Sequence, residues 1–288
     1  MPELLQPRTL SQLTEALGTR GRLLVAAGGT DLLVRLRLHP SGEATVLDLS
    51  AMSDLRGVTE EGAFLRIGAM TTLTALNQCP LAQSRVPVLA EAAGMVGSTQ
   101  IRNRATVGGN VANAAQCADT IPALIALEAE AELMNSAGAL RRVPVADFVT
   151  GIGRTLITEH EVLTGFLIAP EMQGLRGGYG KIGSRKTVTI AKINGAAALR
   201  FENGSIVSAR VAFGSIGQRA FLSETVSAGL TGMSLDQLER GEYLEFFVSQ
   251  VDAAIPGRDS LPYKRSAVKA VAEAIILQAV PECRGCTS

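Results

Sequence analysis

The segment Ile101-Arg-Asn-Arg-Ala-Thr-Val-Gly-Gly-Asn-Val-Ala-Asn-Ala-Ala-Gln-Cys-Ala-Asp-Thr-Ile-Pro122 concentrates glycine and short polar side chains between two apolar regions. At its centre, Gly108 and Gly109 are two consecutive residues without a Cβ atom. Glycine populates positive φ readily, and successive N–H groups in such a turn form a concave site for an anion. We therefore predict a tight turn with φ > 0 at this pair, with its N–H groups facing an anion.

Short hydrogen-bonding side chains surround the glycine pair. Thr106, Asn110 and Asn113 lie close to it in the sequence, and their hydroxyl and amide groups can donate to the same ligand. Asp119 follows, placed to accept a hydrogen bond from a ribose hydroxyl. Two simpler readings stay open: a structural turn at the glycines, and an Asp119 that only caps the helix begun near Pro122.

A second glycine pair has similar surroundings. Arg22-Leu-Leu-Val-Ala-Ala-Gly-Gly-Thr-Asp31 reads as a short apolar strand that ends in Gly28-Gly29 and a polar pair. A helical pattern follows, so free N–H groups are expected at a helix start, where phosphate is stabilised. Two such turns suit a ligand with two phosphates bound without a metal. Capping of the following helix is the alternative role for Thr30 and Asp31.

Taken together, these segments resemble the FAD-binding subunit of the molybdenum hydroxylases, the family of the xanthine dehydrogenase and carbon monoxide dehydrogenase medium chains. The resemblance covers nearly the whole chain. The matching motifs are Ala27-Gly-Gly-Thr-Asp31, Ile101-Arg-Asn103, Ala105-Thr-Val-Gly-Gly-Asn110 and Asp119.

The resemblance implies a set of FAD contacts. Both glycine segments would meet the pyrophosphate, Asp119 the adenosine ribose or its neighbourhood, and the Leu163 backbone the adenine or the flavin edge. Lys181 would lie near the pyrimidine edge of the flavin, where a positive charge stabilises the reduced cofactor. The implied cofactor-binding residues are Ala27, Gly28, Gly29, Thr30, Asp31, Thr106, Gly108, Gly109, Asn110, Asn113, Asp119, Leu163 and Lys181.

The sequence departs from the family pattern at two places. A Ser-Pro pair that members often carry is replaced here by Ala115-Gln116. The aromatic side chain that stacks on the flavin in some relatives has no match at Met95 or Val96, so Tyr179 is our candidate for shielding the ring.

Composition narrows the class of protein. Hydrophobic residues make up 47% of the 288 residues and charged residues 19%, with 27 Lys plus Arg against 27 Asp plus Glu. A balanced charge does not indicate binding to nucleic acid or to an anionic membrane. No apolar run is long enough for a transmembrane span, and the N-terminus lacks the apolar core of a signal peptide. We expect a cytoplasmic protein whose surface is partly covered by partners.

We predict an α+β fold in which a two-part FAD-binding domain precedes a carboxy-terminal domain. By resemblance, the first domain is of the vanillyl-alcohol oxidase type, and the second is a small antiparallel sheet with helices on one face. A polar, glycine-rich stretch follows Pro170 and marks the boundary. We place the FAD-binding domain at 1–172, with parts at about 1–55 and 56–172, and the second domain at 173–288.

Local patterns predict individual elements. A capping box at Thr9 begins a helix that Gly18 ends, and Asn203-Gly204 is the preferred two-residue turn of a hairpin. In the carboxy-terminal third we expect helices over 221–230, 234–251 and 267–279. Cys283 and Cys286 have metal-binding spacing, but no second pair completes four ligands, so we expect no metal site.

No arrangement for acid–base or nucleophilic chemistry on a substrate is recognisable, which is typical of a subunit whose reactive part is its cofactor. The resemblance implies partners that hold molybdenum pterin and 2Fe-2S clusters: a large subunit and an iron–sulfur subunit. This chain would pass electrons from those clusters to NAD+ or another acceptor. The alternatives are a stand-alone FAD-dependent oxidoreductase and a non-catalytic nucleotide-binding scaffold.

Overall fold

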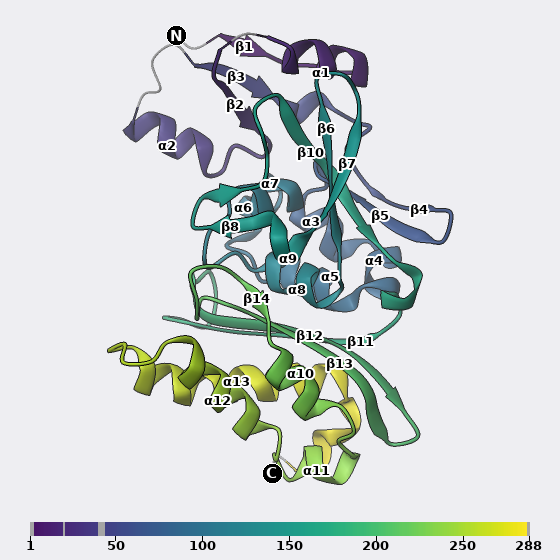
Figure 1. Ribbon diagram of the computed structural model, residues 1–288, viewed down its shortest axis with the longest axis vertical. Helices are drawn as coiled ribbons and strands as arrows, with labels where there is room; N and C mark the ends of the chain where they lie inside the picture. Colours follow the sequence, from purple (N-terminus) through teal and green to yellow (C-terminus); the bar gives the residue numbers. More distant parts are fainter. Residues whose placement is uncertain (1–2, 20, 40–43, 287–288) are drawn as a thin grey trace.

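The computed structural model describes residues 3–19, 21–39 and 44–286. Within these residues, three sheets of three to five strands follow one another along the long axis of the molecule (Figure 1), and a fourth sheet has two strands. The strands are β1 (Leu4–Leu5), β2 (Leu23–Ala26), β3 (Thr45–Asp48), β4 (Val58–Glu61), β5 (Phe64–Gly68), β6 (Glu130–Asn135), β7 (Leu140–Pro144), β8 (Val149–Gly151), β9 (Arg154–Thr155), β10 (Glu161–Ile168), β11 (Arg176–Gly183), β12 (Ala191–Glu202), β13 (Ser205–Gly214) and β14 (Phe221–Leu222).

Helices connect and cover these sheets. They are α1 (Leu10–Leu17), α2 (Leu32–Leu38), α3 (Leu73–Gln78), α4 (Pro80–Arg85), α5 (Pro87–Gly94), α6 (Thr99–Arg102), α7 (Val107–Ala112), α8 (Thr120–Ala126), α9 (Val145–Phe148), α10 (Glu224–Leu230), α11 (Leu235–Glu239), α12 (Leu244–Ala254) and α13 (Leu261–Ala279).

The first sheet is parallel, with strand order β1-β3-β2. Its core is small because a few apolar side chains of α1, including Leu13 and Leu17, pack against Leu47 and Met52. The sheet ends at Ala26, so the first glycine segment leaves from the carboxyl end of β2. This is the position at which open α/β sheets bind ligands.

The second sheet has five antiparallel strands in the order β4-β5-β10-β6-β7. Its core contains α5 and α8, and every residue of α8 is buried. The second glycine segment forms α7, which is held between β5 and α8: the N–H of Gly108 donates to the Ala69 carbonyl just beyond β5, and Asn110 contacts Thr120. The position of the glycines is therefore fixed by a large hydrophobic core.

The third sheet, β11-β12-β13-β14, carries α12 and α13 on one face and packs against α5 and α8 with the other (Figure 1). Glycines allow α13 to lie unusually close, since a Cβ at Gly178 would be 2.1 Å from the Ile275 carbonyl oxygen and one at Gly180 2.5 Å from that of Val271. Because side chains alternate along a strand, Tyr179 and Lys181 point to the opposite face. The sequence Gly178-Tyr-Gly-Lys181 thus presents its glycines to α13 and its polar side chains to the opposite face of the sheet.

The α+β class predicted from the sequence is confirmed. The predicted boundaries near residues 55 and 172 fall in connections between sheets, and they remain predictions of domain organisation. The Asn203-Gly204 hairpin is also confirmed, since both residues have positive φ between β12 and β13.

Two predicted helices were wrong in detail. The stretch 221–230 begins as strand β14, because Phe221 and Leu222 pair with β13, and α10 starts only after the Ser223 N-cap. The stretch 234–251 is two helices, α11 and α12, with Gly241 at φ +71° between them. Both errors arise because apolar spacing does not reveal tertiary strand pairing or a glycine turn inside a helical pattern.

An ion pair across β7 and β10 gives a testable contribution to stability. Arg141 donates two hydrogen bonds of 2.7 Å to Glu161, and they lower the pKa of Glu161 from 4.5 to about 2. We expect Arg141→Met to lower the free energy of unfolding by about 1–2 kcal/mol at neutral pH. The folded-state pKa is depressed, so this contribution is present above the ordinary pKa of 4.5 and is lost as pH falls towards 2.

Denaturant unfolding at several pH values measures this difference. Arg142→Met is the matched control, because Arg142 lies on the same strand and its closest carboxylate oxygen, on Glu132, is 3.9 Å away. The stabilising role of the Arg141–Glu161 pair would be contradicted if Arg141→Met lowered the free energy of unfolding no more than Arg142→Met does. It would also be contradicted if the loss did not shrink as the pH falls.

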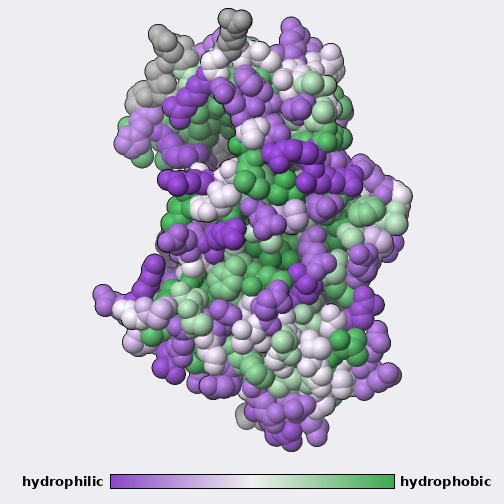
Figure 2. All heavy atoms as spheres, viewed as in Figure 1, coloured by the Kyte–Doolittle hydropathy of each residue, from purple (hydrophilic) through white to green (hydrophobic). Residues whose placement is uncertain are grey.

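Large apolar side chains reach the surface in several places. Helix α2 stands at the side of the N-terminal lobe (Figure 1) and has no buried residue; Leu33, Val34 and Leu38 are 59%, 57% and 69% exposed. Figure 2 shows further apolar side chains across the middle of one face, at the level of α8 and α9. Seven-residue helices are marginal in isolation, so α2 is expected to gain stability from a neighbour.

Among the helices of the described residues, none combines the length and hydropathy needed to cross a membrane.

Candidate cofactor-binding site

The first glycine segment forms a loop between β2 and α2. Gly29 has φ +73°, as a left-handed turn requires. Within residues 3–19, 21–39 and 44–286, the backbone N–H groups of Gly28, Gly29, Thr30 and Asp31 donate no hydrogen bond. Asp31 stands at the N-cap position of α2, but its side chain makes an ion pair of 2.7 Å with Arg35 instead of capping the helix. The loop therefore offers a row of unused donors at a helix start.

The second glycine segment differs from the prediction. Neither Gly108 nor Gly109 has positive φ; both lie in the first turn of α7, which Thr106 caps. Their N–H groups already donate within the chain, from Gly108 to the Ala69 carbonyl oxygen at 2.9 Å and from Gly109 to Thr106 Oγ1 at 3.0 Å. The predicted anion-facing turn was thus wrong here. The lack of side chains serves close packing, because a Cβ at Gly108 would be 2.7 Å from the Ala69 oxygen.

The structure brings the two glycine segments into direct contact. A Cβ at Gly28 would lie 2.0 Å from the carbonyl oxygen of Arg104, and one at Gly109 would lie 3.4 Å from the Ala27 Cβ. Thr120 orients the side chain of Asn110, because Asn110 Oδ1 accepts hydrogen bonds from the Thr120 hydroxyl at 2.6 Å and from the Thr120 N–H at 3.4 Å. Among the residues that the structure describes, the side-chain NH₂ of Asn110 has no hydrogen-bond acceptor and is available to a ligand.

A cavity of about 830 Å³ lies near this contact. One wall is the chain between α5 and α6, including Met95, Thr99 and Arg102, and the other is Lys181 with the loop 183–189. Most residues of the segment 94–102 line the cavity, and residues 104–105 would contact a Cβ at Gly28, so one continuous segment joins the cavity to the first glycine loop. The arrangement suits an extended ligand with two differently recognised ends.

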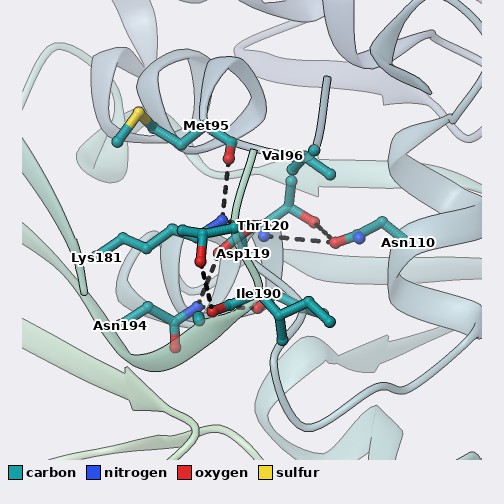
Figure 3. Close-up of polar contacts among 12 residues, drawn as sticks. Met95, Val96, Asn110, Asp119, Thr120, Lys181, Ile190 and Asn194 are labelled. Atoms are coloured by element: carbon teal, nitrogen blue, oxygen red, sulfur yellow. Dashed lines mark hydrogen bonds and ion pairs between the residues drawn. The ribbon is translucent and has the colours of Figure 1, made fainter. Parts of the chain in front are cut away.

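Asp119 and Lys181 meet beside the cavity. The Lys181 ammonium donates to Asp119 Oδ2 at 2.8 Å and to the Met95 carbonyl oxygen at 3.0 Å (Figure 3). Asp119 Oδ1 accepts from the Tyr179 hydroxyl at 2.5 Å and from Asn194 Nδ2 at 3.2 Å. Asp119 stands at the N-cap position of α8, yet its side chain makes no capping bond. Both carboxylate oxygens are therefore engaged, and the capping alternative is not realised.

Burial dominates the electrostatics of this cluster. Desolvation raises the pKa of Asp119 above its ordinary value, and the Lys181 charge and the hydrogen bonds from Lys181, Tyr179 and Asn194 oppose this shift. Burial and the Asp119 charge hold the pKa of Tyr179 well above its usual range. Burial and Asp119 also raise the pKa of the neighbouring Cys117 thiol. Tyr179 thus stays protonated and acts as a donor to the carboxylate.

The role expected of Tyr179 is wrong, whereas the FAD contacts expected of Leu163 and Asn113 remain predictions. Tyr179 is 1% exposed and bound to Asp119, so it is not placed to shield a ring in the cavity. Leu163 lies buried in β10 opposite Leu133 and is not among the residues that line the cavity. Asn113 ends α7, where its N–H donates to the Gly109 carbonyl.

Sequence reasoning did not identify Asn194 or the cavity loop 183–189. Asn194 is completely buried on β12 and lies directly opposite Lys181 in the strand register. An asparagine inside an apolar strand was the available signal. The loop has no motif of its own, and its sequence therefore gave no signal of a cavity wall. In the described part of the chain, no group of three or more His, Cys, Asp or Glu side chains is arranged to hold a metal ion.

Comparison with known proteins gives the same family along the chain. The sequence profile described as FAD binding domain in molybdopterin dehydrogenase matches residues 2–170, and that of the CO dehydrogenase flavoprotein C-terminal domain matches residues 179–279. The xanthine dehydrogenase FAD-binding subunit of Escherichia coli O157:H7 is 34% identical over 209 residues, which cover 72% of this chain and 71% of that protein. The carbon monoxide dehydrogenase medium chain of Hydrogenophaga pseudoflava is 32% identical and covers 78% of both chains.

Solved structures agree over almost the full length. A chain of carbon monoxide dehydrogenase from Hydrogenophaga pseudoflava superposes with a TM-score of 0.84 at 28% identity, covering 98% of each chain. A chain of quinoline 2-oxidoreductase from Pseudomonas putida 86 superposes with a TM-score of 0.85 at 26% identity, also covering 98% of each. The chain belongs to the FAD-binding medium subunits of the molybdenum hydroxylases, the oxidoreductase family that includes the xanthine and carbon monoxide dehydrogenases.

Proposed function

We propose that this chain binds FAD along the segment 94–109, with the pyrophosphate at the first glycine loop and the flavin ring in the cavity beside Lys181. In a complex with an iron–sulfur subunit and a molybdopterin-binding large subunit, it relays electrons to NAD+ or another acceptor. When bound, FAD supplies the conversion between single electrons from iron–sulfur clusters and the electron pair that an acceptor takes. The chain's own residues bind and orient the cofactor.

The observation that carries this proposal is the row of unused N–H groups at Gly28, Gly29, Thr30 and Asp31. A pyrophosphate carries two negative charges, and backbone donors at the start of a helix stabilise such an anion without a metal. The row lies where the two glycine segments touch, so Asn110 can add its side-chain NH₂ from the opposite side. Gly108 and Gly109 contribute by letting α7 approach, since their own N–H groups are occupied.

The cavity fits the ring end of the cofactor. Met95 and Val188 line it and are 42% and 53% exposed, so a flat aromatic ring would cover apolar surface that water now contacts. Lys181 lines the same cavity and supplies a positive charge. Asp119 binds Lys181 and has both oxygens engaged, so we assign it to the ring end and not to the adenosine ribose.

Two observations support the proposed partner subunits: the complexes to which similar proteins belong, and the apolar surface of this chain. The similar chain from Hydrogenophaga pseudoflava is the medium chain of a carbon monoxide dehydrogenase, and the solved structure of that enzyme is described as a form that lacks the Mo-pyranopterin moiety of its molybdenum cofactor. The exposed leucines of α2 leave an apolar surface of the kind that subunit contacts cover. We infer that the metal centres of the complex reside in the companion chains.

The native complex tests this function. We expect purification from the host to yield FAD together with molybdenum and iron, and an oxidisable substrate of the complex, tried among purines and N-heterocycles, to bleach the flavin absorbance. The same substrate should not bleach the flavin of the isolated subunit, because its reduction requires the partner centres. Bleaching of the isolated subunit would favour a stand-alone oxidoreductase. A colourless protein that takes up no FAD would favour a scaffold.

A further inference from the structure

Three polar side chains project from the third sheet towards the FAD-binding domain. Tyr179 and Lys181 are two residues apart on β11 and therefore share a face. Asn194 on β12 is paired directly opposite Lys181. All three contact Asp119, which belongs to the preceding domain (Figure 3 shows Asp119 between Lys181 and Asn194). The carboxy-terminal sheet thus holds a carboxylate that it does not itself carry.

The two oxygens of Asp119 have separate partners. Tyr179 and Asn194 both donate to Oδ1, and Lys181 donates to Oδ2. Asn194 Nδ2 also lies 3.3 Å from the Tyr179 hydroxyl oxygen, so these two side chains support each other. Holding Oδ1 fixes the rotation of the carboxylate and leaves Oδ2 facing the ammonium.

Lys181 is held at two of its three donors. It binds Asp119 Oδ2 and the carbonyl oxygen of Met95, which follows the last residue of α5, where the helix dipole favours a cation. Within the described residues, its third N–H has no partner, and Lys181 lines the cavity. Its side chain is only 3% exposed, so the ammonium acts in a medium of low dielectric constant.

We propose that Tyr179 and Asn194 are positioning residues: they hold the Asp119 carboxylate, and through it the Lys181 ammonium, so that the carboxy-terminal domain tunes the reduction potential of the bound flavin. This inference rests on the proposed binding of FAD in the cavity. Neither residue lines the cavity, so both act through Asp119 and Lys181.

The sign of the effect follows from the charges. Tyr179→Phe removes one donor and leaves the negative charge of Asp119 less compensated. While Asp119 is ionised, the cavity becomes more negative and the reduced cofactor is disfavoured. Acid then neutralises Asp119 and leaves the Lys181 charge unopposed, which favours reduction. Because the missing donor also raises the pKa of Asp119 further, this change occurs at higher pH than in the wild type; Lys181, Tyr179 and Cys117 are the titratable groups that face it.

The experiment measures the flavin midpoint potential of the FAD-loaded complex as a function of pH, by spectroelectrochemical titration. In Tyr179→Phe we expect the ratio of reduced to oxidised flavin to fall about tenfold at alkaline pH, which equals a lowering of about 30 mV for a two-electron couple. We also expect the break in the pH profile to move to higher pH. Tyr243→Phe is the matched control, since Tyr243 is 5% exposed and packs against Phe247, away from Asp119.

Asn194→Leu is a second variant for the same experiment and replaces Tyr179→Phe if that variant does not fold. We expect it to lower the midpoint potential at alkaline pH and to move the break in the pH profile to higher pH. Potentials and pH profiles in these variants that overlay the wild type and Tyr243→Phe would overturn the positioning role. Loss of FAD from a folded Tyr179→Phe protein would also overturn it, because the cluster would then be needed for retention of the cofactor. A wild-type complex without FAD is a different result, which refutes the proposed function itself.

Discussion

Gly28→Ala is expected to weaken FAD binding by about a hundredfold. The added Cβ would lie 2.0 Å from the Arg104 carbonyl oxygen and 2.6 Å from its carbonyl carbon, so backbone must move on one side or the other. Overpacking of this kind costs about 1–3 kcal/mol, and about 2.8 kcal/mol corresponds to a hundredfold in Kd. The displaced loop would also carry the four unused N–H groups away from the second glycine segment.

The measurement is an equilibrium titration of the apo-protein with FAD, followed by quenching of flavin fluorescence. Gly151→Ala is the matched control: this glycine does not have positive φ, and its Cβ would find only an Arg154 side-chain carbon at 3.9 Å. We expect the control to bind like the wild type. Equal affinity in Gly28→Ala would show that the contact between the two segments does not shape the pyrophosphate site.

Lys181→Met is expected to have the largest effect on stability. It leaves the carboxylate of Asp119, which is 5% exposed, without its opposing charge. Breaking a buried pair by removing one partner costs about 3–5 kcal/mol. The pKa of Asp119 is already raised by burial, and removal of Lys181 raises it further. A raised carboxyl pKa means that the folded state binds the proton more tightly, so the penalty is full above the folded-state pKa and shrinks as pH falls through it.

Denaturant unfolding of the purified chain across the neutral and mildly acidic range measures this dependence. Lys186→Met serves as the control, because Lys186 is exposed and lines the same cavity. The difference in the free energy of unfolding between Lys181→Met and Lys186→Met should become smaller as the pH falls. A penalty that is constant with pH, or equal in both variants, would contradict a charged Asp119–Lys181 pair in the folded protein.

Much of the site could be found from the sequence because glycine pairs and their polar neighbours are local signals. Gly28, Gly29, Thr30 and Asp31 do form a loop between a strand and a helix, with unused N–H groups. The geometry of Gly108 was not accessible in this way. Its missing side chain is required by Ala69, a residue far away in sequence, and a local pattern cannot separate a turn with positive φ from a helix packed closely against a distant strand end.

The Asp119 cluster shows the same limit. Asp119 and Lys181 were identified by resemblance, but as contacts at opposite ends of the cofactor. Their pairing depends on how the third sheet is seated against α8, and no periodicity within one domain carries that information. The alternation Gly178-Tyr179-Gly180-Lys181 did contain a usable signal. Glycines at every second position of a strand mark a face pressed against backbone, and the intervening Tyr and Lys must then share the other face.

An experimental structure of the native complex with FAD bound would show where the pyrophosphate and the flavin ring lie. We expect pyrophosphate oxygens within hydrogen-bonding distance of the N–H groups of residues 28–31, and the flavin ring in the cavity beside the Lys181 ammonium. A pyrophosphate bound elsewhere, or a ring outside the cavity lined by Met95 and Lys181, would contradict the proposed binding site.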